Sequence, residues 1–125
     1  MSAFVDTSIL IDHLRGVDAA AELLKRERKA GVLRASEITR LEVLAGMRQS
    51  EEARTHELLA SLLWHAVDEE VAKEAGKLGR MWLPSHREVD AADLAIAATA
   101  ILVGAHLLTL NTRHFPMFAD LRRPY

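Results

Sequence analysis

The chain of 125 residues contains no cysteine, which excludes two common ways of building a small protein or its site. Without cysteine there is no disulfide framework and no zinc site made of thiolates. The six histidines show none of the paired spacings that are typical of zinc ligands. A metal site in this chain is therefore expected to rest on carboxylates.

The glycine-rich signatures of nucleotide sites are missing as well. Neither Gly-x-x-x-x-Gly-Lys nor Gly-x-Gly-x-x-Gly occurs, and there is no Gly-x-Ser-x-Gly motif to expose a catalytic serine. The formal net charge is -2, so the chain has no overall basic field that would attract a polyanion. A local basic patch or a metal bridge to phosphate stays open.

Long hydrophobic runs are also absent. The longest one, Leu94 to Ala105, is too short to span a bilayer and contains Thr99 and Gly104. The N-terminus lacks the basic region, apolar run and cleavage site of a signal peptide. We therefore expect a cytoplasmic protein without a membrane segment, in which residues 1–125 fold as one domain.

The residues that are present alternate between strand and helix patterns. This alternation predicts an α/β fold with a parallel sheet, right-handed crossovers and helices on both faces. Strands are predicted at 3–5, 32–35, 64–67 and 107–110, with a last edge strand at Leu121. Helices are predicted at 9–14, 18–29, 36–46, 51–63, 68–82 and 90–103.

Capping residues mark several helix ends. Ser36, Asp68 and Asp90 are predicted N-caps, and Gly104 is predicted to end the last helix. The apolar residues of the third helix are expected to face the core, namely Ile38, Leu41, Leu44 and Ala45.

Three acids stand where the apolar pattern does not require them. Asp6 ends the first buried strand, Glu42 interrupts an apolar helical stretch, and Asp93 precedes the apolar run of the last helix. An unpaired buried carboxylate costs several kcal/mol, so each acid needs a base, backbone donors or a metal ion. Strand ends and helix starts share one edge of a parallel sheet, so these acids can meet there. Clustered carboxylates without a nearby lysine suit a hard divalent cation.

Each acid also has a purely structural interpretation. Asp6, Thr7 or Ser8 can serve only to cap the helix that follows. Glu42 can lie at the flank of its helix and pair with Arg48 or Lys73. Asp93 is the third residue after Asp90, where an acid completes a capping box.

Four segments, taken in order, resemble the motifs of PIN-domain proteins. They are Phe-Val-Asp-Thr-Ser-Ile-Leu-Ile at 4–11, Ser-Glu-Ile-Thr-Arg-Leu-Glu-Val-Leu-Ala-Gly at 36–46, Asp-Leu-Ala-Ile-Ala-Ala-Thr-Ala at 93–100 and Thr-Leu-Asn-Thr-Arg-His-Phe at 109–115. The sequences of these four motifs and the length of the chain are similar to those of the VapC toxins of bacterial VapBC toxin–antitoxin modules. The resemblance implies an α/β/α sandwich with a central, mostly parallel sheet of four to five short strands and about six to seven helices.

The same resemblance implies a function. A VapC-like chain is expected to be a Mg²⁺- or Mn²⁺-dependent endoribonuclease toxin of a type II system, with RNA as substrate and a VapB-like antitoxin as partner. The invariant acids of the family correspond here to Asp6, Glu42 and Asp93. Asp6 and Asp93 are expected to bind the metal directly, and Glu42 to bind through water or to orient the attacking water.

Further residues are expected at the rim of this site, namely Thr7, Ser8, Asn111 and Arg113. Thr7 and Ser8 would hydrogen-bond the carboxylates or a phosphate. Arg113 would contact substrate phosphate or, as the more ordinary alternative for a lone exposed arginine, simply be solvated. Asn111 stands where the fourth motif of the family often has an aspartate. This departure puts a second metal ion in question.

Two other functions and one assembly are also considered. The chain could be a non-catalytic binding module of PIN-like fold, or a phosphatase with Asp6 as covalent nucleophile. Phosphatases of that kind carry a second acid two residues on, where this chain has Ser8. Apolar residues on charged helices, Met47, Met81 and Trp82, lead us to expect a homodimer.

Overall fold

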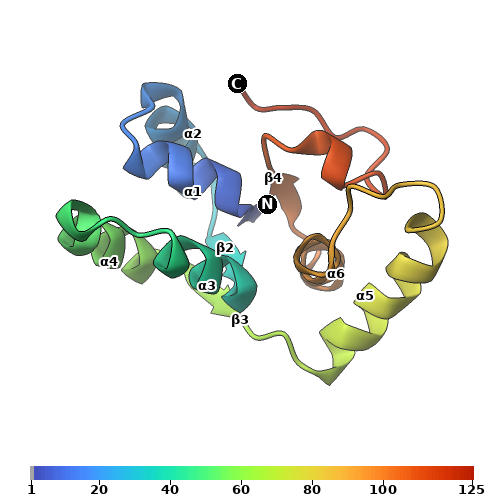
Figure 1. Ribbon diagram of the computed structural model, residues 1–125. Helices are drawn as coiled ribbons and strands as arrows, with labels where there is room; N and C mark the ends of the chain where they lie inside the picture. Colours follow the sequence, from blue (N-terminus) through green and yellow to red (C-terminus); the bar gives the residue numbers. More distant parts are fainter. Residues whose placement is uncertain (1) are drawn as a thin grey trace.

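The computed structural model describes residues 2–125, which form a four-stranded sheet flanked by helices (Figure 1). All strand pairs are parallel, and the strand order is β3-β2-β1-β4. The strands are β1 (Ala3–Val5), β2 (Leu33–Ser36), β3 (Leu63–His65) and β4 (His106–Leu108). The helices are α1 (Thr7–Leu14), α2 (Asp18–Ala30), α3 (Glu37–Ala45), α4 (Glu52–Ala60), α5 (Glu69–Trp82) and α6 (Ala91–Val103), with short 3₁₀ turns η1 (Gln49–Glu51) and η2 (Thr112–His114). The α/β fold class is confirmed.

The strand order reverses between β1 and β4. The chain builds β1, β2 and β3 outward in one direction and then returns to place β4 on the other side of β1. The register pairs Val5 with Leu108, so both strands end at the same level. In open α/β sheets, ligands bind in the crevice beyond the strand ends at such a switch point.

Alternating side chains of the strands divide the core into two layers. Ala3 and Val5 of β1 face a cluster that includes residues of α1, α2 and α4, whereas Phe4 faces the residues of α5 and α6. Phe4 and Val5 are fully buried. Successive side chains of β1 point to opposite faces of the sheet, and both faces are covered by helices. The segment Ala-Phe-Val is therefore apolar at every position.

Most predicted helix ends are confirmed by their hydrogen bonds. The side chain of Ser36 accepts from the Ile38 N–H at 3.1 Å, and that of Asp68 accepts from the Val71 N–H at 3.0 Å. Asp90 caps α6, and Gly104 ends it with a φ of 69°, a left-handed conformation that suits glycine. The segment 84–89 lies between helices, as expected.

The predicted edge strand at Leu121 is wrong. Leu121 lies outside the strands, and its side chain packs against the core layer that contains α5 and α6. After η2, Pro116 follows directly on Phe115, and turns carry the chain over this core rather than along the β4 edge. The described part of the chain therefore has four strands.

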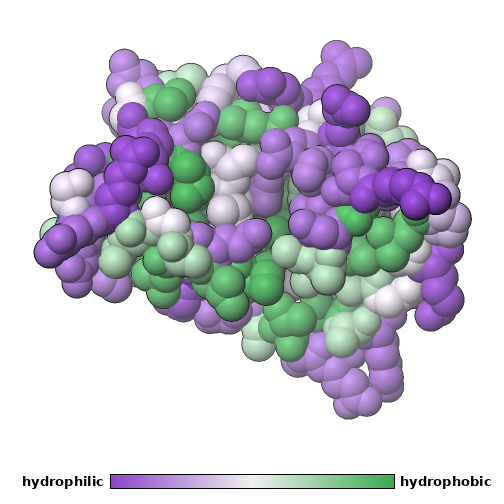
Figure 2. Space-filling view, viewed as in Figure 1, coloured by the Kyte–Doolittle hydropathy of each residue, from purple (hydrophilic) through white to green (hydrophobic). Residues whose placement is uncertain are grey.

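The predicted inward face of α3 is also partly wrong. Leu41 is 60% exposed and Leu44 is 37% exposed, whereas Thr39 and Val43 are fully buried. Thr39 takes an inward position because its hydroxyl lies 3.1 Å from that of Thr7 at the start of α1. Apolar surface gathers over and beside α3 on the face shown in Figure 2.

No helix within residues 2–125 is both long and apolar enough to cross a membrane.

Substitutions on α3 test this rotation of the helix. We expect Val43→Ala to lower the free energy of unfolding by about 1–3 kcal/mol, because it opens a cavity in a buried position. Leu41→Ser should change it by less than about 0.5 kcal/mol because Leu41 already faces solvent. Urea denaturation measures both values. A larger loss for Leu41→Ser than for Val43→Ala would contradict the observed helix orientation.

Candidate active site

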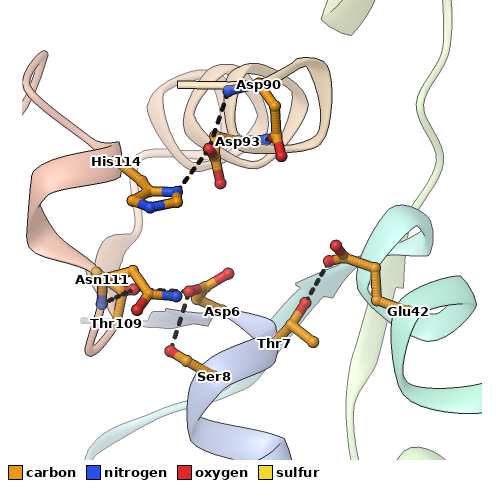
Figure 3. Close-up of polar contacts among 9 residues, drawn as sticks. All are labelled: Asp6, Thr7, Ser8, Glu42, Asp90, Asp93, Thr109, Asn111 and His114. Carbon is orange, nitrogen blue, oxygen red and sulfur yellow. Dashed lines mark hydrogen bonds and ion pairs between the residues drawn. The ribbon is translucent and has the colours of Figure 1, made fainter. Parts of the chain in front are cut away.

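Asp6 lies directly beyond the end of β1 and is only 4% exposed. Its N–H donates to the Leu108 carbonyl at 2.9 Å, so the contact between β1 and β4 continues to this residue. Its Oδ2 accepts hydrogen bonds from the Thr109 hydroxyl at 2.6 Å and the Ser8 hydroxyl at 3.0 Å (Figure 3). Although Asp6 occupies the N-cap position of α1, its side chain makes no capping hydrogen bond. The capping interpretation of Asp6 is therefore wrong.

The two hydroxyls that hold Asp6 also fix the loop after β4. Ser8 Oγ accepts from the Leu110 N–H at 3.1 Å, and Thr109 Oγ1 accepts from the Asn111 N–H at 2.9 Å. Each hydroxyl thus joins the Asp6 carboxylate to the backbone of the segment beyond β4. Sequence reasoning did not single out Thr109, although it opens the fourth motif.

Glu42 reaches the same edge of the sheet from α3. Its Oε1 accepts a hydrogen bond of 2.6 Å from the Thr7 hydroxyl. Among residues 2–125, Glu42 forms no ion pair, and Lys73 pairs instead with Glu69 at 3.1 Å. The pairing of Glu42 with Arg48 or Lys73 is therefore wrong.

Asp93 completes a capping box at the start of α6. Its N–H donates to Asp90 Oδ1 at 2.9 Å, and its Oδ2 accepts from the Asp90 N–H at 3.1 Å. The capping interpretation is confirmed, yet it does not account for the whole side chain. His114 Nδ1 also donates to Asp93 Oδ2, at 3.0 Å.

Burial makes the Asp93 carboxyl a weaker acid than an ordinary aspartate. Loss of solvent, with a smaller contribution from the negative charge of Asp90, raises the pKa of Asp93 to about 6, although the hydrogen bonds from the Asp90 N–H and His114 act in the opposite direction. The side chain of Asp93 is 13% exposed and that of His114 is 38% exposed. The hydrogen bonds to ionised Asp93 therefore do not offset the free-energy cost of removing its carboxylate from water.

These acids surround one cleft, which we call the acid cleft, with a volume of about 450 Å³. Figure 3 shows Asp6, Glu42 and Asp93 facing an open space between α1, α3 and α6. Among the described residues that line it there is no lysine or arginine. Five carboxylates line it, from Asp6, Asp12, Glu42, Asp90 and Asp93.

The acids share the cleft without forming a compact ligand cluster. Within residues 2–125, no three histidine, aspartate or glutamate side chains lie close enough together to make a ready-made metal site. The donor set nevertheless fits a hard divalent cation, because it consists of carboxylate oxygens with no compensating basic side chain.

The remaining predicted residues lie at different places. Thr7 and Ser8 line the acid cleft and hold carboxylates, and Asn111 is exposed at its rim. Arg113 does not line this cleft but an adjoining hollow. Sequence reasoning missed His114, whose only signal was its place in the fourth motif, one helical turn after Asn111.

Comparison with known proteins decides the family. The model of the PIN domain matches residues 3–121. The chain belongs to the PIN-domain family. It is 49% identical to Ribonuclease VapC19 of Mycobacterium tuberculosis over 122 residues, which cover 97% of this chain and 98% of that protein.

Solved structures support the same assignment of this PIN domain. A toxin–antitoxin complex from Klebsiella pneumoniae contains a chain with a TM-score of 0.82 and 29% identity, covering 99% of this chain and 98% of that one. VapBC-1 from nontypeable Haemophilus influenzae matches with a TM-score of 0.75 and 25% identity, over 98% and 96% of the two chains. The resemblance to VapC proteins is confirmed, and PIN-domain VapC ribonucleases generally depend on a divalent metal.

The raised pKa of Asp93 leads to a prediction about stability. The folded-state pKa of Asp93, about 6, exceeds the ordinary value of 3.8, so ionised Asp93 destabilises the fold. This loss of folding free energy is absent below pH 3.8, grows as the pH rises, and is complete above pH 6. Asp93→Asn should therefore raise the melting temperature at pH 7 in chelator. Near pH 3.8, the ordinary pKa of aspartate, the substitution should give no such rise. The variant should also gain less from Mn²⁺, since metal binding to the folded state produces that gain.

Asp68→Asn is the matched control, because Asp68 is an N-cap acid of α5 that does not line the acid cleft. Its response to Mn²⁺ should equal that of the wild type. If Asp93→Asn melts lower in chelator and responds to Mn²⁺ as the wild type does, Asp93 is a helix cap and not a metal ligand.

Proposed function

We propose that the chain is a metal-dependent endoribonuclease toxin of a type II toxin–antitoxin system, which hydrolyses RNA phosphodiesters with Mg²⁺ or Mn²⁺. The observation that carries this proposal is the buried Asp6, held by two hydroxyls at the β1–β4 switch point in a cleft of five carboxylates. Membership of the PIN-domain family and 49% identity to a ribonuclease support the same activity.

Asp6 and Asp93 are the proposed metal ligands. Mg²⁺ usually takes one or two protein carboxylates and keeps several waters, so a wide acid cleft without a compact three-ligand cluster suits it. Thr109 and Ser8 both bind Oδ2 of Asp6, and within residues 2–125 no side chain donates to Oδ1, which is left for a cation. A bound divalent cation would lower the pKa of water and neutralise charge on the phosphodiester in the transition state.

Glu42 is the proposed residue for the attacking water. The hydrogen bond from Thr7 holds one carboxylate oxygen, so the other can bind a water on the metal or orient one for attack. Asn111 offers an amide carbonyl at the rim but no charge, which favours one directly bound cation over two.

The rival functions have less support in the geometry. Aspartate-nucleophile phosphatases carry a second acid two residues after the nucleophile, but position 8 of this chain is a serine whose hydroxyl donates to Asp6 Oδ2. A non-catalytic module requires that the acids serve the fold alone, yet Asp6 makes no helix cap and Glu42 no ion pair within the described chain.

A small VapB-like antitoxin is the proposed protein partner. The structures from Klebsiella pneumoniae and Haemophilus influenzae are of a toxin–antitoxin complex and of VapBC-1. In the complex, a segment of the antitoxin would reach the acid cleft. A short neighbouring reading frame that encodes a DNA-binding protein, and co-purification of its product with this chain, would test the proposal.

Asp6→Asn should abolish RNA cleavage while the fold remains intact. The amide can still accept hydrogen bonds from Ser8 and Thr109, but it removes the negative charge that a cation requires. Cleavage of a structured RNA in Mn²⁺ gives the activity, and circular dichroism gives the fold. Asp120→Asn, an exposed change outside the acid cleft, is the control and should cleave as the wild type does. Turnover by Asp6→Asn at the wild-type rate would remove Asp6 from the mechanism.

We also propose that the chain forms a homodimer. Met81 on α5 is 62% exposed, which is unusual for a large apolar side chain, whereas Trp82 packs partly into the core. Light scattering should show a dimer for the wild type and a larger monomer fraction for Met81→Glu. A purely monomeric wild type at high concentration would rule out this assembly.

A further inference from the structure

A second hollow adjoins the acid cleft, and its chemistry is different. It has a volume of about 440 Å³ and shares Leu110, Asn111 and His114 with the acid cleft. The other lining residues are Glu88, Thr112, Arg113 and Arg123. We call this space the arginine hollow. The two spaces therefore adjoin along the segment after β4, which contributes to the lining of both.

The C-terminal segment from Leu121 to Tyr125 contributes Arg123 to the wall of the arginine hollow. Both ends of this segment pack against the core. Leu121 packs against the core layer of α5 and α6, whereas Tyr125 packs against the opposite layer. The Tyr125 hydroxyl donates to Asp12 Oδ2 at 2.9 Å, and Asp12 lines the acid cleft. The segment therefore crosses the switch-point edge of the sheet, and Arg123 lies between the two attachments.

The charges of the two spaces are opposite. Five carboxylates and no arginine line the acid cleft, whereas two arginines and one carboxylate, Glu88, line the arginine hollow. Arg113 and Arg123 are exposed, and within residues 2–125 neither makes an ion pair or a side-chain hydrogen bond. Their guanidinium donors are therefore available to an anion.

We propose that the arginine hollow is a subsite for the RNA backbone, in which Arg113 and Arg123 bind a phosphodiester next to the one that is cleaved. This inference rests on the proposed ribonuclease function. Guanidinium groups bind phosphate oxygens in a bidentate manner, and such contacts set the position of a nucleic acid without reading its bases. The strand would pass Asn111 and His114 between the two spaces. The carboxylates of the acid cleft repel phosphate when no cation is bound, so the arginine hollow supplies the attraction that the cleft lacks.

Binding and cleavage can be measured separately. A fluorescein-labelled single-stranded RNA is titrated with the full chain in chelator, and fluorescence anisotropy gives the Kd at several salt concentrations. Arg113→Gln and Arg123→Gln should each raise the Kd by about three- to tenfold. Each should also reduce the slope of log K against log salt by about 0.7, the value for loss of one phosphate contact on a single strand.

Arg122→Gln is the matched control. Arg122 is exposed, adjacent in sequence and of the same charge, but it does not line the arginine hollow. Its Kd and salt slope should stay close to the wild-type values. Equal effects of Arg122→Gln and Arg123→Gln would show a diffuse charge effect and overturn the subsite. Unchanged melting temperatures for all three variants exclude unfolding as the cause of weaker binding.

Cleavage distinguishes failure of the subsite from failure of the proposed function. With Mn²⁺ present, Arg123→Gln should raise KM while kcat stays near the wild-type value, since it removes binding remote from the reacting atoms. If the wild type cleaves RNA and Arg123→Gln binds and cleaves as well, the subsite is wrong and the ribonuclease stands. If the wild type cleaves no RNA in Mn²⁺, the proposed function itself fails.

Discussion

The hydrogen bonds of Asp6 join the ends of strands β1 and β4. A carboxylate that is 4% exposed lies at the junction of β1 and β4, and hydroxyls from Ser8 and Thr109 hold one of its oxygens. Those same hydroxyls accept from the backbone of Leu110 and Asn111, so the loop after β4 depends on them too. Because hydroxyls carry no charge, the arrangement orients Asp6 without placing a positive charge beside it. A buried carboxylate is thereby held at the place where a parallel sheet offers its binding crevice.

The other acids arrive at this edge by independent structural routes. Glu42 is carried by α3, whose start is set by the Ser36 cap, and Asp93 is held in the first turn of α6 by its capping box with Asp90. A structural role and a functional role are therefore not exclusive: the groups that cap α6 also bring a carboxylate of raised pKa to the acid cleft. Within residues 2–125 these acids share the cleft without forming a compact three-ligand cluster.

A division of charge follows along the same edge. The acid cleft attracts cations and repels phosphate, and the adjoining arginine hollow attracts phosphate. RNA binding and cation binding would then rest on different residues, joined by the Asn111–His114 segment that both spaces share. Such a division allows substrate affinity and catalytic rate to change separately, and it accounts for a chain of net charge -2 that acts on a polyanion.

Much of this protein could be predicted from the sequence because its signals are local. Ala3–Val5 is apolar at every position, Ser36, Asp68 and Asp90 cap helices, and Gly104 ends one, all through interactions within a few residues. The convergence of Asp6, Glu42 and Asp93 was foreseeable because parallel strands share one carboxyl edge. Tertiary contacts decided the rest. Thr39 rather than Leu41 faces inward because Thr7, 32 residues away, offers it a hydroxyl. The segment after β4 lies against α1 and α6, and this long-range packing is encoded by no local pattern. It decides the roles of Thr109 and His114 and the place of Arg123 beside the acid cleft.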